Sequence, residues 1–322
     1  MCRIRSLAVL VAALSLSAAP TAACGSSGGG DAKSITVAAL PLVDTAGLHI
    51  AVQQKFFEAE GLRVRIKPVA QSIQALPALK TGQVDVIAGG NYVTFLQAQE
   101  QGTLKLRVLA AGAAAAPRFM SVLTLPGSPI ERPKDLVGRT VAVNILNNIQ
   151  SLSLNAILKA DRIDPSGVEY RAIPFPQMGA ALQRHQIDAV HVAEPFGTDL
   201  ARKLGARVVV DGGSGPAVAG LPVSGYLSTQ QFVDKNPEVA AAFQRAISKA
   251  QQVATGDRTK VDQVLPSYAR LDAKTAAALN LPGYPPSLDP AALQRLADMM
   301  LADGLLKNKI DARSLVFTPR SS

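Results

Sequence analysis

The order of apolar and polar residues predicts alternating strands and helices in the first third of the chain. An apolar run at 35–40 is typical of a buried strand, and 44–60 carries apolar side chains at helical spacing before Gly61. Residues 63–69 alternate between basic and apolar side chains, as in a half-exposed strand. Alternation of strand and helix predicts a mostly parallel sheet covered on both faces. The other expected elements here are strands at 84–88 and 104–110 and helices at 72–81 and 92–101.

The same plan returns about 103 residues later. Residues 140–144 resemble 36–40, and residues 186–190 resemble 83–87. A spacing this long does not suit a solenoid and indicates two similar lobes. The alignment pairs His185 with the helix-ending Gly82, Asn148 with Asp44, and Glu194 with Asn91.

Two segments, 119–128 and 225–231, are expected to cross between the lobes. The first lobe would then be discontinuous, formed by 34–122 plus 225–322, and the second lobe would be the insert 123–224. The expected fold class is therefore α/β, with two βα lobes joined by two crossover strands. Helices expected in the C-terminal part lie at 237–255, 260–269 and 290–303.

The N-terminus predicts export. Arg3 and Arg5 precede an apolar run at 7–14, which is too short to span a bilayer. Small residues then lead to Cys24 and a Gly/Ser tether at 24–33. The segment predicted to be removed is a signal peptide at 1–23.

This arrangement resembles a bacterial lipoprotein signal, although Thr21 stands where that family prefers Leu. The resemblance implies that Cys24 is lipidated and becomes the first mature residue. The protein would then be exported and anchored by lipid to the cell membrane, on the extracytoplasmic face. The alternative is an ordinary secretory signal with an incidental Cys24.

Composition excludes several classes. The 322 residues are 48% hydrophobic and 18% charged, which is too apolar for a disordered chain. Two cysteines cannot form a disulfide framework, and three isolated histidines do not form a metal site. The net charge of +9 comes without basic clusters interleaved with aromatic residues, so no nucleic acid is expected as a partner. We expect a monomer without cofactor or metal.

Four segments resemble one known family in their order and spacing. They are FFEAEGL at 56–62, LKTGQVDV at 79–86, DLVGRTVAV at 135–143, and IDA through EPF at 187–196. The chain is similar to the substrate-binding proteins of ABC importers, of the nitrate/sulfonate/taurine type. Proteins that bind thiamine-precursor pyrimidines share the pattern.

The resemblance implies a bilobal periplasmic-binding-protein-like fold and no enzymatic activity. It also implies that the protein captures a small polar solute and delivers it to an ABC permease and its ATPase. A sulfonate or taurine-type solute is expected first, and a pyrimidine second. A tethered ligand sensor and a pyrimidine-synthase-like enzyme stay open as further alternatives. Against such an enzyme, the chain after Cys24 contains no cysteine, and the strand-end loops expected to line the cleft contain no lysine.

Ligands of open α/β sheets lie at the carboxyl ends of the strands, where helices begin and offer free N–H groups. The loops at 41–46, 88–92, 144–149 and 193–197 are therefore expected to line a cleft. Arg118 is the nearest cation, and Tyr226 is one of few aromatic side chains available to a ring. The candidate ligand-binding residues are Asp44, Gly89, Gly90, Asn91, Arg118, Asn144, Asn147, Asn148, Glu194 and Tyr226.

Several of these candidates have a structural alternative. Asp44 and the three asparagines at 144, 147 and 148 could cap helices, with or without touching a ligand. Glu194 could accept from an amino group or complement a helix dipole, and His191 is expected to be packed in a strand. None of the four loops contains Lys or Arg, whereas two contain a carboxylate. A ligand with donor groups therefore fits better than a bare anion.

Overall fold

Two five-stranded sheets organise residues 32–319, the part of the chain described by the computed structural model. The first sheet has the order β2-β1-β3-β10-β4, and the second has the order β7-β6-β8-β5-β9. The strands of the first sheet are β1 (Lys33–Ala39), β2 (Leu62–Pro68), β3 (Val86–Asn91), β4 (Leu106–Ala114) and β10 (Pro222–Thr229). Those of the second are β5 (Met120–Thr124), β6 (Thr140–Val143), β7 (Glu169–Ala172), β8 (Ala189–Ala193) and β9 (Arg207–Asp211).

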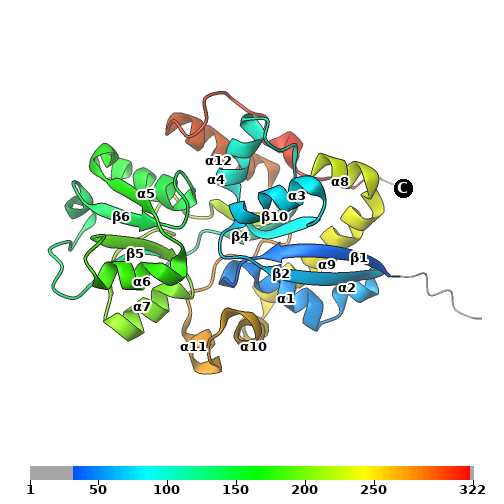
Figure 1. Ribbon diagram of the computed structural model, residues 1–322, viewed down its shortest axis with the longest axis horizontal. Helices are drawn as coiled ribbons and strands as arrows, with labels where there is room; N and C mark the ends of the chain where they lie inside the picture. Colours follow the sequence, from blue (N-terminus) through cyan, green and yellow to red (C-terminus); the bar gives the residue numbers. More distant parts are fainter. Residues whose placement is uncertain (1–31, 320–322) are drawn as a thin grey trace, which may run out of the picture. The chain divides into compact units, whose positions relative to one another are not determined.

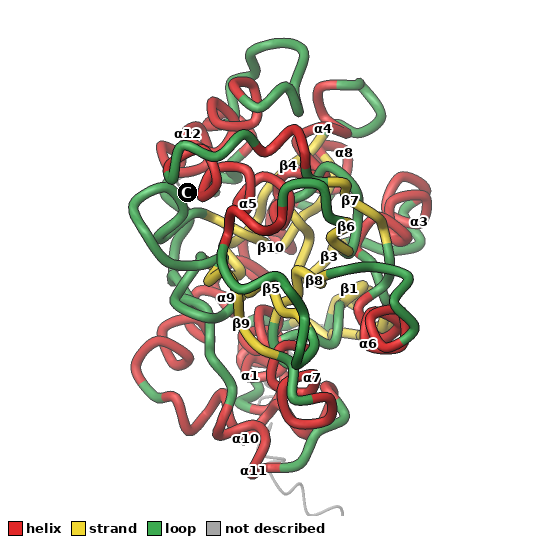
Figure 2. The backbone as a smooth tube through the Cα atoms, turned by 90° about the vertical axis from the view of Figure 1, so that its left-hand side faces the viewer, coloured by secondary structure: helices red, strands yellow, loops and turns green. Residues whose placement is uncertain are grey.

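Helices lie outside the strands of both sheets (Figure 2). In sequence order they are α1 (Ala46–Gln53), α2 (Phe56–Ala59), α3 (Leu76–Thr81), α4 (Tyr92–Glu100), α5 (Ile149–Ala160), α6 (Phe175–Gln183), α7 (Phe196–Leu204), α8 (Gln230–Lys235), α9 (Pro237–Gly256), α10 (Arg258–Ala269), α11 (Ala273–Ala278) and α12 (Pro290–Ala302). Short 3₁₀ turns occur at Val43–Thr45, Ser72–Ala75, Pro133–Leu136, Pro165–Gly167 and Arg313–Leu315.

Both sheets are parallel except for one antiparallel strand each. β10 runs antiparallel to β3 and β4, and β5 runs antiparallel to β8 and β9. These strands follow the two points where the chain crosses between sheets, after β4 and after β9. The predicted bilobal α/β fold is confirmed, and Figure 1 shows the second-sheet elements in green beside the blue, cyan and yellow elements of the first.

The exact division into lobes stays a prediction. The expected boundary at 122/123 falls inside β5, and the one at 224/225 falls inside β10. Each strand belongs whole to one sheet, so we would place both divisions in the connections that precede these strands. Below, each sheet with the helices packed on it is called a lobe.

The internal repeat predicted from the sequence is confirmed by equivalent contacts in the two sheets. The amide of Thr36 donates to Asp85 Oδ2 at 2.7 Å, and the amide of Thr140 donates to Asp188 Oδ2 at 2.8 Å. His185, which the alignment pairs with Gly82, takes the same left-handed conformation, with φ of 54°. The aspartates of the repeated motif therefore fasten the segment before one strand to the backbone of the neighbouring strand.

One predicted helix was wrong in its extent. Residues 44–60 form a 3₁₀ turn followed by α1 and α2, because Lys55 adopts a left-handed conformation between the two helices. The C-terminal helices lie close to their predicted ranges, whereas α11 was missed because six residues rich in alanine carry no apolar periodicity. A search of 32–319 found no helix both long and apolar enough to cross a bilayer.

Burial explains the strand patterns. All residues of β3 except its last are buried, as expected for a strand covered on both faces. In β2, at the edge of its sheet, Arg63, Arg65 and Lys67 are exposed, as their alternation predicts. Charged side chains on an edge strand also oppose pairing with another chain.

The predicted signal peptide, Cys24 and nearly all of the predicted tether lie outside the described residues.

Candidate functional site

A small cavity of about 40 Å³ lies between the strand ends of the two sheets. The first lobe contributes the loop after β1, the end of β3 and Ser224 of β10, and the second contributes the segment from β6 into α5. This volume would hold a few water-sized atoms, so the lobes enclose little free space. Asp44 is the one charged side chain among its lining residues.

Asp44 lies on the first-lobe wall and is only 4% exposed. Its Oδ2 accepts a hydrogen bond from the Ser224 hydroxyl at 2.7 Å, whereas its Oδ1 has no partner in the described structure. Burial raises the pKa of Asp44 to about 6, against the opposing effect of the Ser224 hydrogen bond. An unpaired buried carboxylate oxygen is costly, which makes it an acceptor ready for a ligand donor.

Glycine at position 89 allows the first-lobe wall to come close to this carboxylate. Gly89 has φ of 71°, and a Cβ there would lie 2.9 Å from Thr45 Cγ2 and 3.4 Å from Asp44 Oδ2. A larger residue would therefore be strained and would press on the carboxylate segment.

Two tyrosines, the buried Tyr284 and the half-buried Tyr268, hold the segment that carries Asp44. The Tyr284 hydroxyl donates to the Val43 carbonyl at 2.8 Å, and the Tyr268 hydroxyl donates to the Leu42 carbonyl at 3.2 Å. Both tyrosines come from the C-terminal part of the chain, more than 220 residues away. They fix the backbone on which the position of the Asp44 carboxylate depends.

The second-lobe wall is built around Gln150, which is 2% exposed. Its Oε1 accepts from the Asn144 amide and from Asn148 Nδ2, both at 2.8 Å, and its Nε2 donates to the His191 carbonyl. Asn148 in turn caps α5 by accepting from the amides of Gln150 and Ser151. The predicted capping by Asn148 is confirmed, and the network fixes this wall by satisfied hydrogen bonds.

The side chain of Asn144 stands apart from this network. It is 5% exposed, lines the cavity, and makes no hydrogen bond to any described residue, its Oδ1 being buried and unpaired. Asn144 and Asp44 thus offer unpaired polar groups to one cavity from two lobes. An amide can donate or accept, whereas the ionised carboxylate can only accept.

The structure brings half of the predicted ligand residues to the cavity. Those that line it are Asp44, Gly89, Asn91, Asn144 and Asn148. Asn91 also caps α4, accepting from the Thr94 amide at 3.4 Å. The expectation that Asp44 caps a helix was wrong, because its carboxylate meets Ser224 and no cap hydrogen bond from it is present.

The other predicted residues lie outside the cavity lining, each for a visible reason. Gly90 packs against Leu227, Tyr226 is fully buried in the core, and Arg118 is exposed, with its amide bound to Asp211 Oδ1. Asn147 is exposed and takes a left-handed conformation, so its side chain is turned to the surface.

Glu194 follows β8 at the position equivalent to Asn91, but it is occupied elsewhere. Its carboxylate accepts from the amide and hydroxyl of Thr198 at 2.9 and 2.8 Å, at the start of α7. It also accepts from Asn280 Nδ2 at 3.0 Å. Of the two readings of Glu194, the structure favours support of the helix start. His191 is fully buried, as predicted, and burial lowers its pKa to about 4.

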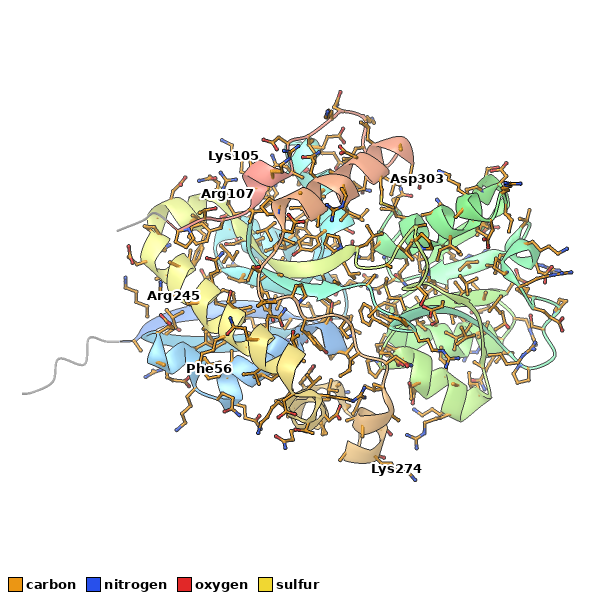
Figure 3. The ribbon with its side chains drawn as sticks, turned by 180° about the vertical axis from the view of Figure 1, so that it is seen from behind. Phe56, Lys105, Arg107, Arg245, Lys274 and Asp303 are labelled. Carbon is orange, nitrogen blue, oxygen red and sulfur yellow. The ribbon has the colours of Figure 1, made fainter. Side chains whose placement is uncertain are left out.

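Several contacts join the lobes around the cavity. Gln97 Nε2 donates to the Asn147 carbonyl at 2.9 Å, and Gln71 Nε2 donates to the Asn144 carbonyl. Lys159 of α5 also pairs with Asp303, which lies at the end of α12 facing the second lobe (Figure 3). The lobes are therefore held together by several polar contacts.

A larger groove of about 710 Å³ adjoins the cavity between the lobes. Leu40, Leu42 and Phe175 line both spaces, and the groove continues along Val69, Phe196 and further apolar residues. Phe175 and Phe196 stack with ring centroids 5.3 Å apart. A polar cavity thus opens next to an apolar space.

Sequence reasoning missed Gln150, Ser72 and Ser224 as cavity residues. Gln150 stands two residues after Asn148, and its helix-start position could have suggested a role. Ser72 and Ser224 carry no such signal, because each reaches the cavity only through the tertiary fold. Within 32–319 no three His, Cys, Asp or Glu side chains gather in a way that could hold a metal ion.

Comparisons with known proteins agree on the family. Residues 43–259 match the family model described as "NMT1/THI5 like". The chain is 26% identical over 197 residues to the taurine-binding periplasmic protein of Escherichia coli (strain K12). That match covers 61% of this chain and 59% of the length of its relative.

Solved structures share the fold. One is the alkanesulfonate-binding protein SsuA from Xanthomonas axonopodis pv. citri bound to MOPS, with a TM-score of 0.74 and 19% identity, covering 89% of this chain and 99% of the other. Another is the desulfurization enzyme DSZB, with a TM-score of 0.63 and 16% identity, covering 88% and 96%. These likenesses establish the fold, which therefore serves both binding proteins and an enzyme. The family match extends over two thirds of the chain, and the protein belongs to the NMT1/THI5-like family.

Proposed function

We propose that the protein is an extracytoplasmic solute-binding lipoprotein that captures a small polar solute between its lobes and delivers it to an ABC importer. The observation that carries the proposal is the cavity, to which each lobe contributes an unpaired polar side chain. A solute that satisfies Asp44 and Asn144 together favours the closed arrangement, because these contacts need both walls.

A taurine or sulfonate type of solute is supported by what known relatives are called. The Escherichia coli relative is named for taurine, and the Xanthomonas structure is described as bound to MOPS. Taurine carries an amino group that suits Asp44. Its sulfonate would rest on amide groups, since no Lys or Arg is among the cavity residues.

The pyrimidine alternative has weaker support. Tyr92, Phe95 and Tyr226 are fully buried in the core, where they cannot stack on a ring in the cavity. Phe196 lines the adjoining groove and Phe175 lines both spaces. Catalysis is not part of the proposal, because Asp44 is the one ionisable group lining the cavity and stands without a partner for proton transfer.

The proposed anchor, partners and state complete this function. Cys24 would carry the lipid, an ABC permease with its ATPase would receive the closed form, and the protein would act as a monomer. The cell-surface location and lipid anchor are testable by following Cys24→Ser, which we expect to be released from the membrane fraction in soluble form.

Ligand stabilisation tests the function. The purified Cys24→Ser protein should gain thermal stability with one compound from a panel of taurine, alkanesulfonates, nitrate, aminopyrimidines, amines and carboxylates. Stabilisation that survives removal of the ligand-facing groups Asp44 and Asn144 would place binding elsewhere. A folded protein that no panel compound stabilises would contradict the proposal.

A further inference from the structure

The cavity residues define a preference of charge. Asp44 is the only charged group there, it is buried, and one of its oxygens is unpaired. An anion placed beside a buried carboxylate is repelled in a medium that screens poorly, whereas a cation is attracted. A bare anion would therefore be opposed at this wall, although relatives are named for anionic or zwitterionic solutes.

The two unpaired side chains suit one donor group. Asp44 Oδ1 and Asn144 Oδ1 are both acceptors, each belongs to a residue at least nine-tenths buried, and they come from different lobes. An ammonium group has three N–H donors and no acceptor, so it has enough donors for both oxygens. Charge-assisted hydrogen bonds of this kind are the stronger ones.

The space beyond the cavity is mainly apolar where the two spaces meet, and Asp199, Lys203 and Arg270 also line the groove. Leu40, Leu42 and Phe175 belong to the cavity and to the 710 Å³ groove, so the two spaces share one border. Past that border lie the stacked Phe175–Phe196 pair and Tyr268, which stacks on His49 with ring centroids 3.6 Å apart. A substituent that leaves the cavity would therefore meet apolar and aromatic surface first.

We propose that the solute is an organic ammonium compound whose amino end binds Asp44 and Asn144 and whose apolar or aromatic substituent occupies the adjoining groove. The proposal rests on the proposed solute-binding function and narrows its ligand class. It identifies two subsites, one selecting charge and the other selecting an apolar body.

Four probes separate the two subsites by isothermal titration: 2-phenylethylamine, ethylamine, 2-phenylethanesulfonate and taurine. The expected order puts 2-phenylethylamine first, with a Kd at least about tenfold below that of ethylamine because the ring buries apolar surface. The matched sulfonate, which has the same ring and the opposite charge, is expected to bind at least about tenfold more weakly than the amine.

Two variants assign each effect. Asp44→Asn should weaken 2-phenylethylamine binding at least about tenfold, and the exposed-site control Asp161→Asn should leave it unchanged. Phe196→Ala, which alters the groove and no residue that lines the cavity, should weaken 2-phenylethylamine binding about fivefold or more and leave ethylamine binding unchanged. Circular dichroism on each variant shows that the protein is folded.

Equal or tighter binding of the sulfonate, an unaltered amine affinity in Asp44→Asn, or no binding of either amine would each overturn the proposal. Binding of the sulfonate or taurine alone would leave the solute-binding function intact while refuting the ligand class. Loss of the function itself would be recognised separately, by failure of the whole stabilisation panel.

Discussion

The two walls of the cavity are built on the same strand plan and yet offer different chemistry. In both sheets an aspartate, Asp85 or Asp188, accepts a hydrogen bond from the amide of a threonine on a neighbouring strand. At the strand ends the walls diverge. The first presents Asp44 with one hydrogen bond, and the second presents amides held by Gln150.

This difference separates what folds the lobes from what recognises a solute. The repeated aspartates hold sheets together and lie away from the cavity lining. The first wall carries an incompletely satisfied charge, which costs stability and offers binding energy. In the second wall, Gln150 binds the Asn144 amide, the Asn148 side chain and the His191 carbonyl and so stiffens the frame, while the Asn144 side chain itself stays unpaired.

The largest effect is expected from breaking the second wall. Gln150→Ala removes the acceptor for two N–H donors and the donor for the His191 carbonyl, all buried. We expect a loss of about 3–4 kcal/mol in the free energy of unfolding, from urea titration. The exposed Gln74→Ala should change it by less than about 0.5 kcal/mol. A small loss at Gln150 would show that the amide network does not hold this wall.

The first wall should respond to pH. The folded-state pKa of Asp44, about 6, exceeds its ordinary value of 3.8, so the folded state favours the protonated carboxyl. The contribution of this group to stability is complete below pH 4 and is lost as pH rises past 6, a loss of about 3 kcal/mol. Asp44→Asn should therefore gain stability relative to the native protein as pH rises from 4 to 7.

The native protein must be compared with Asp44→Asn because His49 and His191 titrate in the same pH range. Burial lowers the pKa of His49 and His191 to about 4, so their contribution is lost as pH falls from above 6.5 toward 4. That slope has the opposite sign and is common to both proteins. If the difference in the free energy of unfolding between the native protein and Asp44→Asn stays constant from pH 4 to 7, the raised pKa assigned to Asp44 is contradicted.

A smaller effect on stability tests whether the equivalent aspartate contacts in the two sheets are equally strong. Asp85→Ala and Asp188→Ala each remove an acceptor for a strand amide, at 2.7 and 2.8 Å. Each should lower the free energy of unfolding by about 1–2 kcal/mol, with the two values within about 0.5 kcal/mol. Thermal unfolding of both variants measures these losses. A loss in only one variant would show that the two equivalent contacts do not contribute equally to stability.

Much of the fold could be predicted because its signals are local. Apolar runs such as 35–40, the αL positions at Gly82 and His185, and the repeat spacing depend on nearby residues. The break between α1 and α2 at Lys55 could not be predicted, since the apolar side chains keep their helical spacing across it.

The site could be predicted only in part, for a related reason. Loops at strand ends can be recognised from the sequence, so Asp44, Asn91 and Asn144 were predicted correctly as cavity residues. Whether a side chain in such a loop faces the cavity depends on tertiary partners, as Glu194 shows by binding Thr198 and Asn280. Tyr268 and Tyr284 act on Asp44 from the far end of the chain, and no local pattern indicates that.

The most direct test of the central claim is the distance between the lobes with and without a bound solute. Both cysteines, Cys2 and Cys24, precede the described residues, so two introduced cysteines can be labelled specifically in Cys24→Ser protein cleaved after the signal. Lys67→Cys and Gln177→Cys are exposed positions whose neighbours, Ile66, Pro68 and Pro176, line the groove.

Electron double resonance between spin labels at these positions measures that distance. We expect a broad distribution of label-to-label distances without ligand and one short distance at saturating 2-phenylethylamine. When Asp44→Asn is added, we expect no such narrowing of the distance distribution. An unchanged distribution, at a concentration where calorimetry shows the site filled, would contradict the claim that solute binding closes the two walls on each other.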